Sequence, residues 1–197
     1  MSEITYRAAW RKNDPELERD ALTFWDSRKK LLPQNADANK RVKQLCAVAY
    51  RDEKPVGVST ASIEFVPQLR LRMAVYRCSV AIGMRRKPLS WTITDFSREV
   101  LEEWSLAHPE EKCMGLLAVL QAREFVERYP MVTGPASMTF IGVTPQGFPV
   151  RVSWFKHAEV PNTWPPKPLP RQAAGPAQRQ MQNRGPGITL PPGRRMQ

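Results

Sequence analysis

The seven residues MGLLAVL, at positions 114–120, most constrain how this chain can fold. Every position is apolar, so both faces of the segment must be covered if it forms a strand. An apolar run of this length is typical of a strand in the middle of a sheet with layers on both sides. Periodicity alone leaves one alternative open, a single helix over residues 112–129.

The segments around this run alternate between strand-like and helical patterns. The strand-like segments are ITYRAAW (4–10), VKQLCAVAY (42–50), PVGVSTASIEFV (55–66), LRMAVYRCSVAI (71–82) and the hairpin MTFIGVTPQGFPVRVSWF (138–155). Helical patterns begin at Asp14-Pro15 and at Asp95, and a third covers residues 121–129. The order β-α-β-β-β-α-β-α-β-β predicts an α/β or α+β protein, with a mixed sheet of six to seven strands flanked by helices.

The composition changes sharply after Glu159. Residues 161–197 contain nine prolines, four glycines, five glutamines, six Lys or Arg and no acidic residue. This segment has too few apolar residues for a core, so we expect a tail that is disordered or ordered only by a partner. We therefore predict a globular domain at 1–160 and a basic tail at 161–197. The tail holds just over half of the net charge of +11, so we expect its partner to be anionic, either a protein assembly or a nucleic acid.

The cysteines indicate a reducing compartment. Cys46, Cys78 and Cys113 are odd in number, widely spaced and form no CxxC pair, and the chain has only two histidines. This pattern predicts reduced thiols and no metal site. No apolar run approaches the ~20 residues of a membrane span, and the N-terminal segment lacks the apolar core of a signal peptide. The sequence thus predicts a cytoplasmic protein without a membrane span.

Three consecutive cations, Arg85, Arg86 and Lys87, lie between a predicted strand and the helix that follows it. A helix N-terminus already carries partial positive charge and unpaired N–H groups. Further cations are unfavourable there unless an anion lies between them. The segment therefore predicts a site for a phosphate group.

The order of elements over residues 3–158 resembles the GNAT superfamily of acyl-CoA N-acyltransferases. The family's second and third strands resemble LCAVAYRDEKPVGVSTASI, and its fourth strand and pyrophosphate loop resemble AVYRCSVAIGMRRKPLSW. Its fifth strand and the helix after it resemble MGLLAVLQAREF, and its last two strands resemble FIGVTPQGFPVRVSWF. The family's loop has Arg or Gln, two residues, Gly, one residue, then Gly or Ala. Here Arg85 keeps the first position, whereas Pro88 and Ser90 replace the two glycine positions.

The resemblance implies an N-acyltransferase that uses acetyl-CoA as co-substrate to acylate an unidentified primary amine. The residues it implies for the cofactor are Ser79, Val80, Ala81, Ile82, Arg85, Arg86, Lys87, Leu89 and Ser90. It also implies a general base, for which Glu64 is the candidate, and an acid for the departing thiolate, which is Tyr129 or Tyr76.

Two other functions fit the same residues. Loss of the loop glycines suits a catalytically inactive scaffold whose basic tail anchors it in a larger assembly, such as a viral particle or nucleoprotein complex. Direct nucleic-acid binding suits the charge, although the chain has no recognised nucleic-acid motif. The sequence leaves homodimer formation open, although exposed edge strands in such sheets often pair.

Overall fold

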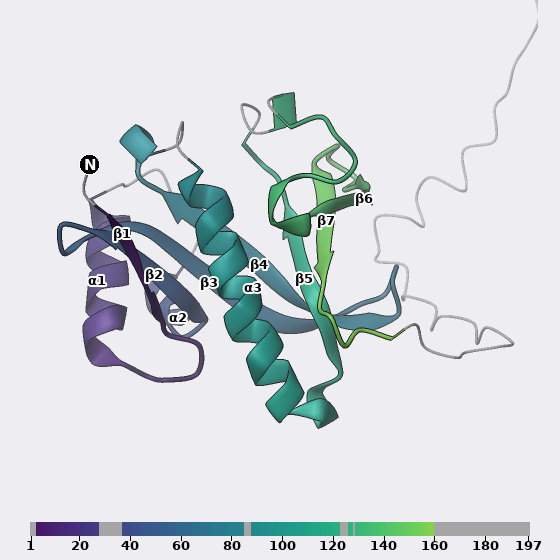
Figure 1. Cartoon of the computed structure of the whole chain (residues 1–197), viewed down its shortest axis with the longest axis horizontal. Coiled ribbons are helices and arrows are strands. Elements are labelled where there is room, and N and C mark those ends of the chain that lie inside the picture. Colours follow the sequence, from purple (N-terminus) through teal and green to yellow (C-terminus); the bar gives the residue numbers. More distant parts are fainter. Residues whose placement is uncertain (1–2, 28–36, 85–87, 123–125, 128, 160–197) are drawn as a thin grey trace, which may run out of the picture. The chain divides into compact units, whose positions relative to one another are not determined.

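Seven strands form one mixed sheet in the computed structural model, which describes residues 3–27, 37–84, 88–122, 126–127 and 129–159. The strands are β1 (Ile4–Ala8), β2 (Leu45–Arg51), β3 (Lys54–Val66), β4 (Leu71–Val80), β5 (Cys113–Val119), β6 (Thr139–Val143) and β7 (Pro149–Trp154). Their order in the sheet is β1-β2-β3-β4-β5-β7-β6 (Figure 1). Only the β4–β5 pair is parallel; the other five pairs are antiparallel. The predicted fold class and strand number are confirmed.

The central apolar run forms the strand β5, and the alternative of one helix over 112–129 is wrong. β5 pairs with β4 on one side and β7 on the other, and Leu116 is fully buried. The predicted helix at 121–129 falls partly outside the described residues; of those described, Gln121, Ala122 and Tyr129 are not helical and Val126 and Glu127 are. The predicted tail also lies outside the described residues.

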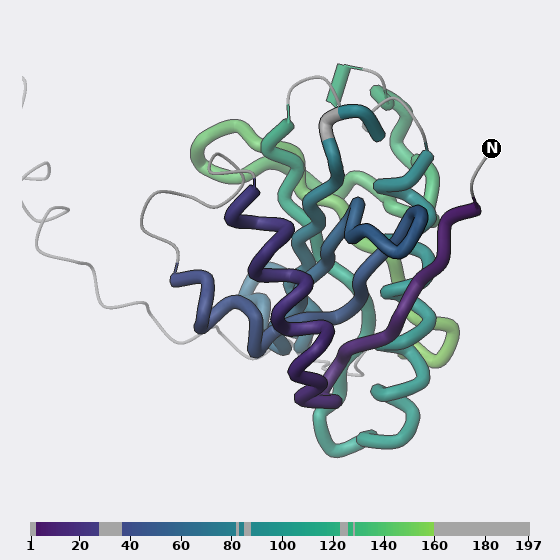
Figure 2. The backbone as a smooth tube through the Cα atoms, turned by 90° about the vertical axis from the view of Figure 1, so that its left-hand side faces the viewer, coloured from purple at the N-terminus to yellow at the C-terminus, as the bar shows by residue number. Residues whose placement is uncertain are grey.

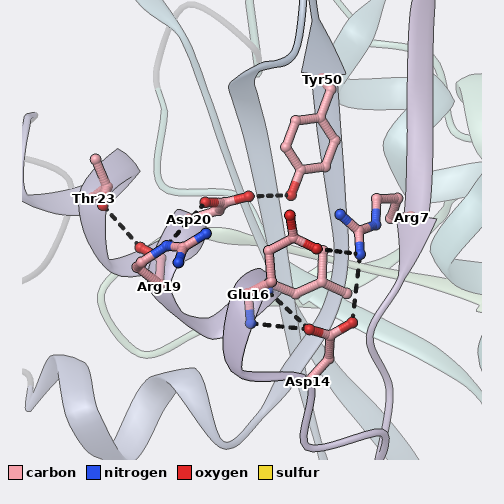
Figure 3. A network of polar contacts seen from close by, with 8 residues as sticks. Arg7, Asp14, Glu16, Arg19, Asp20, Thr23 and Tyr50 are labelled. Carbon is pink, nitrogen blue, oxygen red and sulfur yellow. Dashed lines mark hydrogen bonds and ion pairs between the residues drawn. The ribbon is translucent and has the colours of Figure 1, made fainter.

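Helix α1 (Pro15–Asp26) begins where the Asp14-Pro15 pair predicts. The Asp14 carboxylate accepts hydrogen bonds from the backbone N–H groups of Glu16 and Leu17, at 3.0 and 3.2 Å. Arg7 reaches from β1 to the same helix start and pairs with Glu16 at 2.9 Å (Figure 3). The strand and the helix start are therefore tied together by side chains.

A short helix, α2 (Ala38–Val42), overlaps the start of the strand predicted at 42–50. Asp37 caps it by accepting from the N–H groups of Asn39 and Lys40. The helix takes Val42 out of the predicted strand, so β2 begins at Leu45.

Helix α3 (Leu89–Ala107) begins six residues before the predicted start at Asp95. Leu89 and Ile93, one helical turn apart, are 2% and 0% exposed and extend the buried face of the helix toward its N-terminus. Burial of this face outweighs the absence of a capping side chain, because the residue at the cap is Pro88, which makes no side-chain cap bond. The helix ends at Ala107, just before His108-Pro109.

The two long helices cover opposite faces of the N-terminal half of the sheet (Figure 2). Tyr50 on β2 donates a hydrogen bond to Asp20 on α1 at 2.7 Å (Figure 3). On the other face, the hydroxyl oxygens of Ser59 on β3 and Ser97 on α3 lie 2.8 Å apart. Coverage on both sides explains why β2 is buried from Leu45 through Tyr50. None of the described helices is long and apolar enough to span a membrane.

Candidate functional site

The parallel strands β4 and β5 separate before β4 ends. Their paired residues run from Arg72 with Cys113 to Tyr76 with Ala118, whereas β4 continues to Val80. Beyond Tyr76, β4 remains paired with β3 on its other side, up to Val80 with Gly57. Figure 1 shows the two strands diverging at this end of the sheet. Beyond Tyr76 the β5 side of β4 therefore has no partner strand among the described residues, and this stretch is here called the β4–β5 split.

Alternation along β4 determines which backbone groups face the split. The N–H of Ala81 donates to the carbonyl of Val56 on β3 at 2.8 Å. In an antiparallel pair the backbone groups of alternate residues point toward the same neighbour. Ser79 and Ala81 therefore point their amides toward β3, and Cys78 and Val80 point theirs toward the split. Of the strand residues predicted to bind the cofactor, Val80 is the one whose backbone faces the β4–β5 split.

The predicted cofactor-binding set does not include Cys78, although the backbone of this residue faces the split. A strand sequence does not say which of the two alternate sets of amides points to which neighbouring strand. Ile82, the last strand residue of the predicted set, lies instead in a short 3₁₀ turn (Ile82–Met84) that leads out of β4.

The predicted phosphate loop joins the 3₁₀ turn after β4 to the first turn of α3 along the chain. Arg85, Arg86 and Lys87 lie outside the described residues. On the helix side of the loop, the first turn of α3 holds no acidic residue and no capping side chain. The Leu89 side chain is buried in the core, so only its main chain is available to a ligand. The Ser90 carbonyl accepts from Thr94 Oγ1 at 2.7 Å.

Two tyrosines lie on the α3 face of the sheet beside the split. Tyr76 is 3% exposed, and its hydroxyl oxygen lies 3.2 Å from Thr94 Oγ1. Burial raises the pKa of Tyr76 well above its ordinary value, so its hydroxyl keeps its proton at neutral pH. The Tyr129 ring packs edge-on against Trp91 of α3, with ring centroids 4.9 Å apart.

Glu64 lies on the opposite face of the sheet from the two tyrosines. It is exposed, its Cα partner on β4 is Met73, and its carboxylate accepts from the hydroxyl of Ser62. The structure therefore does not bring Glu64 and Tyr129 together on one face. A general base at Glu64 and an acid at Tyr129 would therefore have to reach the thioester from opposite faces of the sheet.

The side chain of His157 and the thiols of the cysteines are not candidates for proton transfer at the split. The Nε2 atom of His157 is 3.1 Å from Ser105 Oγ, near the C-terminal end of α3 and away from the split. Burial raises the pKa of both Cys46 and Cys78 to about 12, so neither offers a thiolate at neutral pH. Within the described part of the chain, no group of three His, Cys, Asp or Glu side chains could hold a metal ion.

A pocket of about 260 Å³ lies elsewhere, between the loop before α1 and the segment that joins α2 to β2. Its lining includes Glu18 and Lys43, whose carboxylate and ammonium groups are 2.7 Å apart. Because these two charges satisfy each other, the pocket does not indicate a ligand.

No family profile and no curated protein matches the sequence. Solved structures do match. The loading GNATL domain of CurA from Lyngbya majuscula is 11% identical, with 79% of this chain and 99% of that domain covered and a TM-score of 0.52. A GNAT-family acetyltransferase from Streptococcus pneumoniae is 12% identical, with 78% and 100% covered and a TM-score of 0.47.

A third match is a mutant of the toxin AtaT, bound to the C-terminus of the antitoxin AtaR and to acetyl-CoA. It is 14% identical, with 78% of this chain and 94% of that chain covered and a TM-score of 0.49. Identities this low speak to architecture, and the GNATL domain has the highest TM-score of these three. Together with the strand order and the divergence of β4 from β5, that likeness shows that the chain has the GNAT fold.

Proposed function

We propose that the protein transfers an acyl group from an acyl-coenzyme A thioester, acetyl-CoA in the simplest case, to a primary amine. The β4–β5 split carries this proposal. It presents backbone N–H and C=O groups of Cys78 and Val80 that no described strand pairs with, and the amide-containing pantetheine arm of coenzyme A would extend the sheet there by strand-like hydrogen bonds. The fold supports this use of the split, because it is the fold of acyl-CoA N-acyltransferases.

The loop before α3 supplies the phosphate end of the same site. Arg85, Arg86 and Lys87 would pair with the pyrophosphate of coenzyme A, and the uncapped first turn of α3 adds N–H groups and partial positive charge. Pro88 has no N–H to donate, so side-chain charge takes a larger share of the binding than main-chain contacts.

The proposed reaction forms a C–N bond and breaks the C–S bond of the thioester. A neutral amine attacks the carbonyl carbon, and an N–H group at the split stabilises the negative charge that develops on the carbonyl oxygen. The attacking nitrogen then loses a proton, and the departing thiolate gains one. The amine approaches the carbonyl carbon from outside the carbonyl plane, whereas the thiolate leaves from a position within it, so different groups can serve the two steps.

Tyr129 and Tyr76 are the proposed acids, because both lie on the α3 face beside the split. Glu64 is the proposed base on the other face. Along β3 it is three residues from Ala61, the partner of Tyr76, which corresponds to about 10 Å along a strand. We therefore propose that Glu64 takes the proton through a chain of several waters, because a single bridging water spans only about 6 Å.

Calorimetric titration of acetyl-CoA into the full chain tests the proposal. We expect binding in the micromolar range that weakens by at least ~150-fold in the double variant Arg85→Ala, Arg86→Ala, because each of the two lost charge-assisted phosphate contacts is worth about 1.5–3 kcal/mol. The control is the double variant Arg19→Ala, Lys40→Ala, which removes the same charge from side chains that are 71% and 88% exposed on α1 and α2. Equal affinities for all three proteins would refute the phosphate assignment.

A second candidate function is a non-catalytic scaffold anchored by the basic tail. The replacement of both loop glycines by Pro88 and Ser90 favours it, because these changes reduce close backbone approach to a pyrophosphate. Absence of acetyl-CoA binding to the full chain, together with loss of assembly when residues 161–197 are deleted, would support this function over acyl transfer.

A further inference from the structure

A buried arginine on β7 binds the backbone of the connection between β5 and β6. Arg151 is 4% exposed, and its guanidinium donates at 2.8–3.3 Å to the backbone carbonyls of Tyr129, Met131, Val132 and Met138. None of these four residues belongs to a described helix or strand, and one side chain gathers their carbonyls around a single point. Residues 129–138 are here called the arginine-bound loop, because these charge-assisted bonds fix the course of its backbone.

Two residues of the arginine-bound loop have strained backbone conformations. Ala136 and Ser137 have φ angles of 56° and 52°, in the left-handed region that residues other than glycine rarely adopt. Such conformations persist only where the surrounding contacts over-determine them. The carbonyl of Met138, next to this pair, accepts from Arg151 at 2.9 Å and from the N–H of Gly134 at 3.0 Å. Strain of this kind clusters at functional sites, which makes the loop a candidate part of the reaction site.

The arginine-bound loop begins with Tyr129, one of the two proposed acids. The backbone carbonyl of Tyr129 accepts from Arg151 Nη2 at 2.9 Å, and its ring packs edge-on against Trp91 of α3. The ring also packs against the apolar cluster that contains Tyr76 and Ala118, the last Cα partners before β4 and β5 separate. Arg151 therefore fixes the backbone from which the Tyr129 side chain extends, beside the split.

Exposure separates the two proposed acids. Tyr76 is 3% exposed, and its hydroxyl oxygen lies 3.2 Å from Thr94 Oγ1 inside the core. Tyr129 is half-buried, so part of its side chain is open to solvent. An acid must come within about 3 Å of the atom that it protonates. A bound thioester can approach Tyr129 without entering the core, so Tyr129 is the better placed of the two.

We propose that Arg151 is a positioning residue for the proposed acyl transfer, on which this inference rests. By holding the arginine-bound loop, Arg151 places the Tyr129 hydroxyl where it protonates the departing sulfur of coenzyme A. In that step the C–S bond of the tetrahedral intermediate breaks, and its electron pair goes to sulfur. The Tyr129 O–H supplies the proton to sulfur, and solvent then returns a proton to the phenolate. Arg151 itself contacts no reacting atom.

A double-mutant cycle in the full chain tests this role, with release of the coenzyme A thiol from acetyl-CoA as the measured rate. Water serves as the acceptor, because the departing sulfur needs the same proton whichever nucleophile attacks. Tyr129→Phe removes the hydroxyl and should lower kcat ~100-fold. Arg151→Lys keeps the charge but not the forked geometry, and the resulting misplacement of Tyr129 should lower kcat ~10-fold.

The dependence of one effect on the other separates positioning from general support of the fold. Once Tyr129 is Phe, adding Arg151→Lys should lower kcat less than ~2-fold, because no hydroxyl is left to position. The KM for acetyl-CoA should stay unchanged in both single variants, since the contact is made only as the thiolate departs. The matched control is Arg7→Lys, which alters a 43% exposed arginine at the start of α1 and should leave kcat unchanged.

A milder variant covers the case in which Arg151→Lys does not fold, which circular dichroism detects. A Cβ atom on Gly134 would lie 3.2 Å from Arg151 Nη1, so Gly134→Ala displaces the guanidinium without removing it. Gly134→Ala should lower kcat by at least ~2-fold, and only when the Tyr129 hydroxyl is present. No loss of kcat in this folded variant would then overturn the proposal.

Three results with the folded lysine variant would also overturn it. They are an unchanged kcat in Arg151→Lys, an equal loss of kcat with and without the Tyr129 hydroxyl, and a rise in KM alone. If the unmodified protein binds acetyl-CoA but releases no coenzyme A, the proposed acyl transfer is refuted, and this role with it. Release that is insensitive to Arg151→Lys refutes the positioning role alone.

Discussion

The guanidinium of Arg151 carries a buried positive charge that is satisfied by four backbone carbonyls. Among the described residues it forms no ion pair. Arg151→Met should lower the free energy of unfolding by about 3–5 kcal/mol, since the four carbonyls lose their donor inside the protein. Arg7→Met, which removes an arginine that is 43% exposed in surface ion pairs, should cost about 1 kcal/mol or less. Urea denaturation measures both, and similar values would contradict this role of Arg151.

The buried thiol of Cys46 predicts a pH dependence of stability. Burial raises its pKa from 9.0 to about 12, so between these values the unfolded chain releases a proton that the folded chain retains. Unfolding is then favoured as pH rises, and stability falls by about 1.4 kcal/mol per pH unit for this thiol. Below pH 9 both states hold the proton, and the thiol contributes no pH dependence.

Replacing Cys46 should therefore change how steeply the free energy of unfolding depends on pH. In Cys46→Ala, the plot of unfolding free energy against pH should be less steep by about 1.4 kcal/mol per unit between about pH 9.5 and 11.5. The small cavity left by the substitution lowers stability equally at every pH, so it does not affect the slope. Parallel lines for the two proteins would contradict the raised pKa.

Some residue roles could be read from the sequence, and others depend on contacts that it does not contain. The cap at Asp14 follows from the Asp-Pro pair, because the capping geometry is local. Arg151 gives no such sign, since an arginine in an alternating strand is typical of an exposed face. Its burial depends on the loop that folds over it. The choice of Val80 over Ser79 at the split likewise depends on which amides β3 occupies.

At the scale of elements, the close packing of β5 on β7 gives a sharp prediction. A Cβ atom on Gly115 would lie 2.6 Å from the Ser153 carbonyl oxygen and 3.1 Å from Trp154 Cα, both backbone atoms that cannot move without breaking the strand pair. Gly115→Ala should therefore destabilise the protein by about 2–3 kcal/mol. At Gly57 on β3 the nearest atoms are side-chain atoms at 3.5 Å, so Gly57→Ala should cost less than about 1 kcal/mol.

The comparison between these two alanine variants tests the register of β5 against β7. Thermal or urea unfolding measures both, and a Gly115→Ala variant as stable as Gly57→Ala would mean that the two strands are not paired as described. The register matters for function because the β5–β7 pair holds β5 in position where it parts from β4.

The sequence predicted long elements better than short ones. β5 was identified because seven apolar residues need cover on both faces, a requirement that few arrangements satisfy. α2 was missed because its five residues are too short to show a helical period, and only Asp37 could have indicated a cap. The helical pattern placed the start of α3 at Asp95, whereas the burial of Leu89 decides the actual start. Local rules were overridden where tertiary packing was strong.

For the whole molecule, we predict that residues 1–160 fold without the tail. Every described strand and helix ends at or before Trp154, and the described core residues lie between Ala9 and Phe155. A fragment of residues 1–160 should keep a cooperative transition and an unfolding free energy within about 1 kcal/mol of the full chain. A fragment that unfolds non-cooperatively, or loses several kcal/mol, would place part of the core in the tail.

The central claim, that the β4–β5 split binds an acyl-CoA, is tested most directly by residue-resolved amide hydrogen exchange with and without acetyl-CoA. The account predicts that saturating acetyl-CoA slows exchange at Cys78 and Val80, whose amides face the split, and in the first turn of α3. Exchange at Ser79 and Ala81 should change little, because β3 already protects their amides. Unchanged exchange at Cys78 and Val80, or protection confined to residues away from the split, would contradict the account.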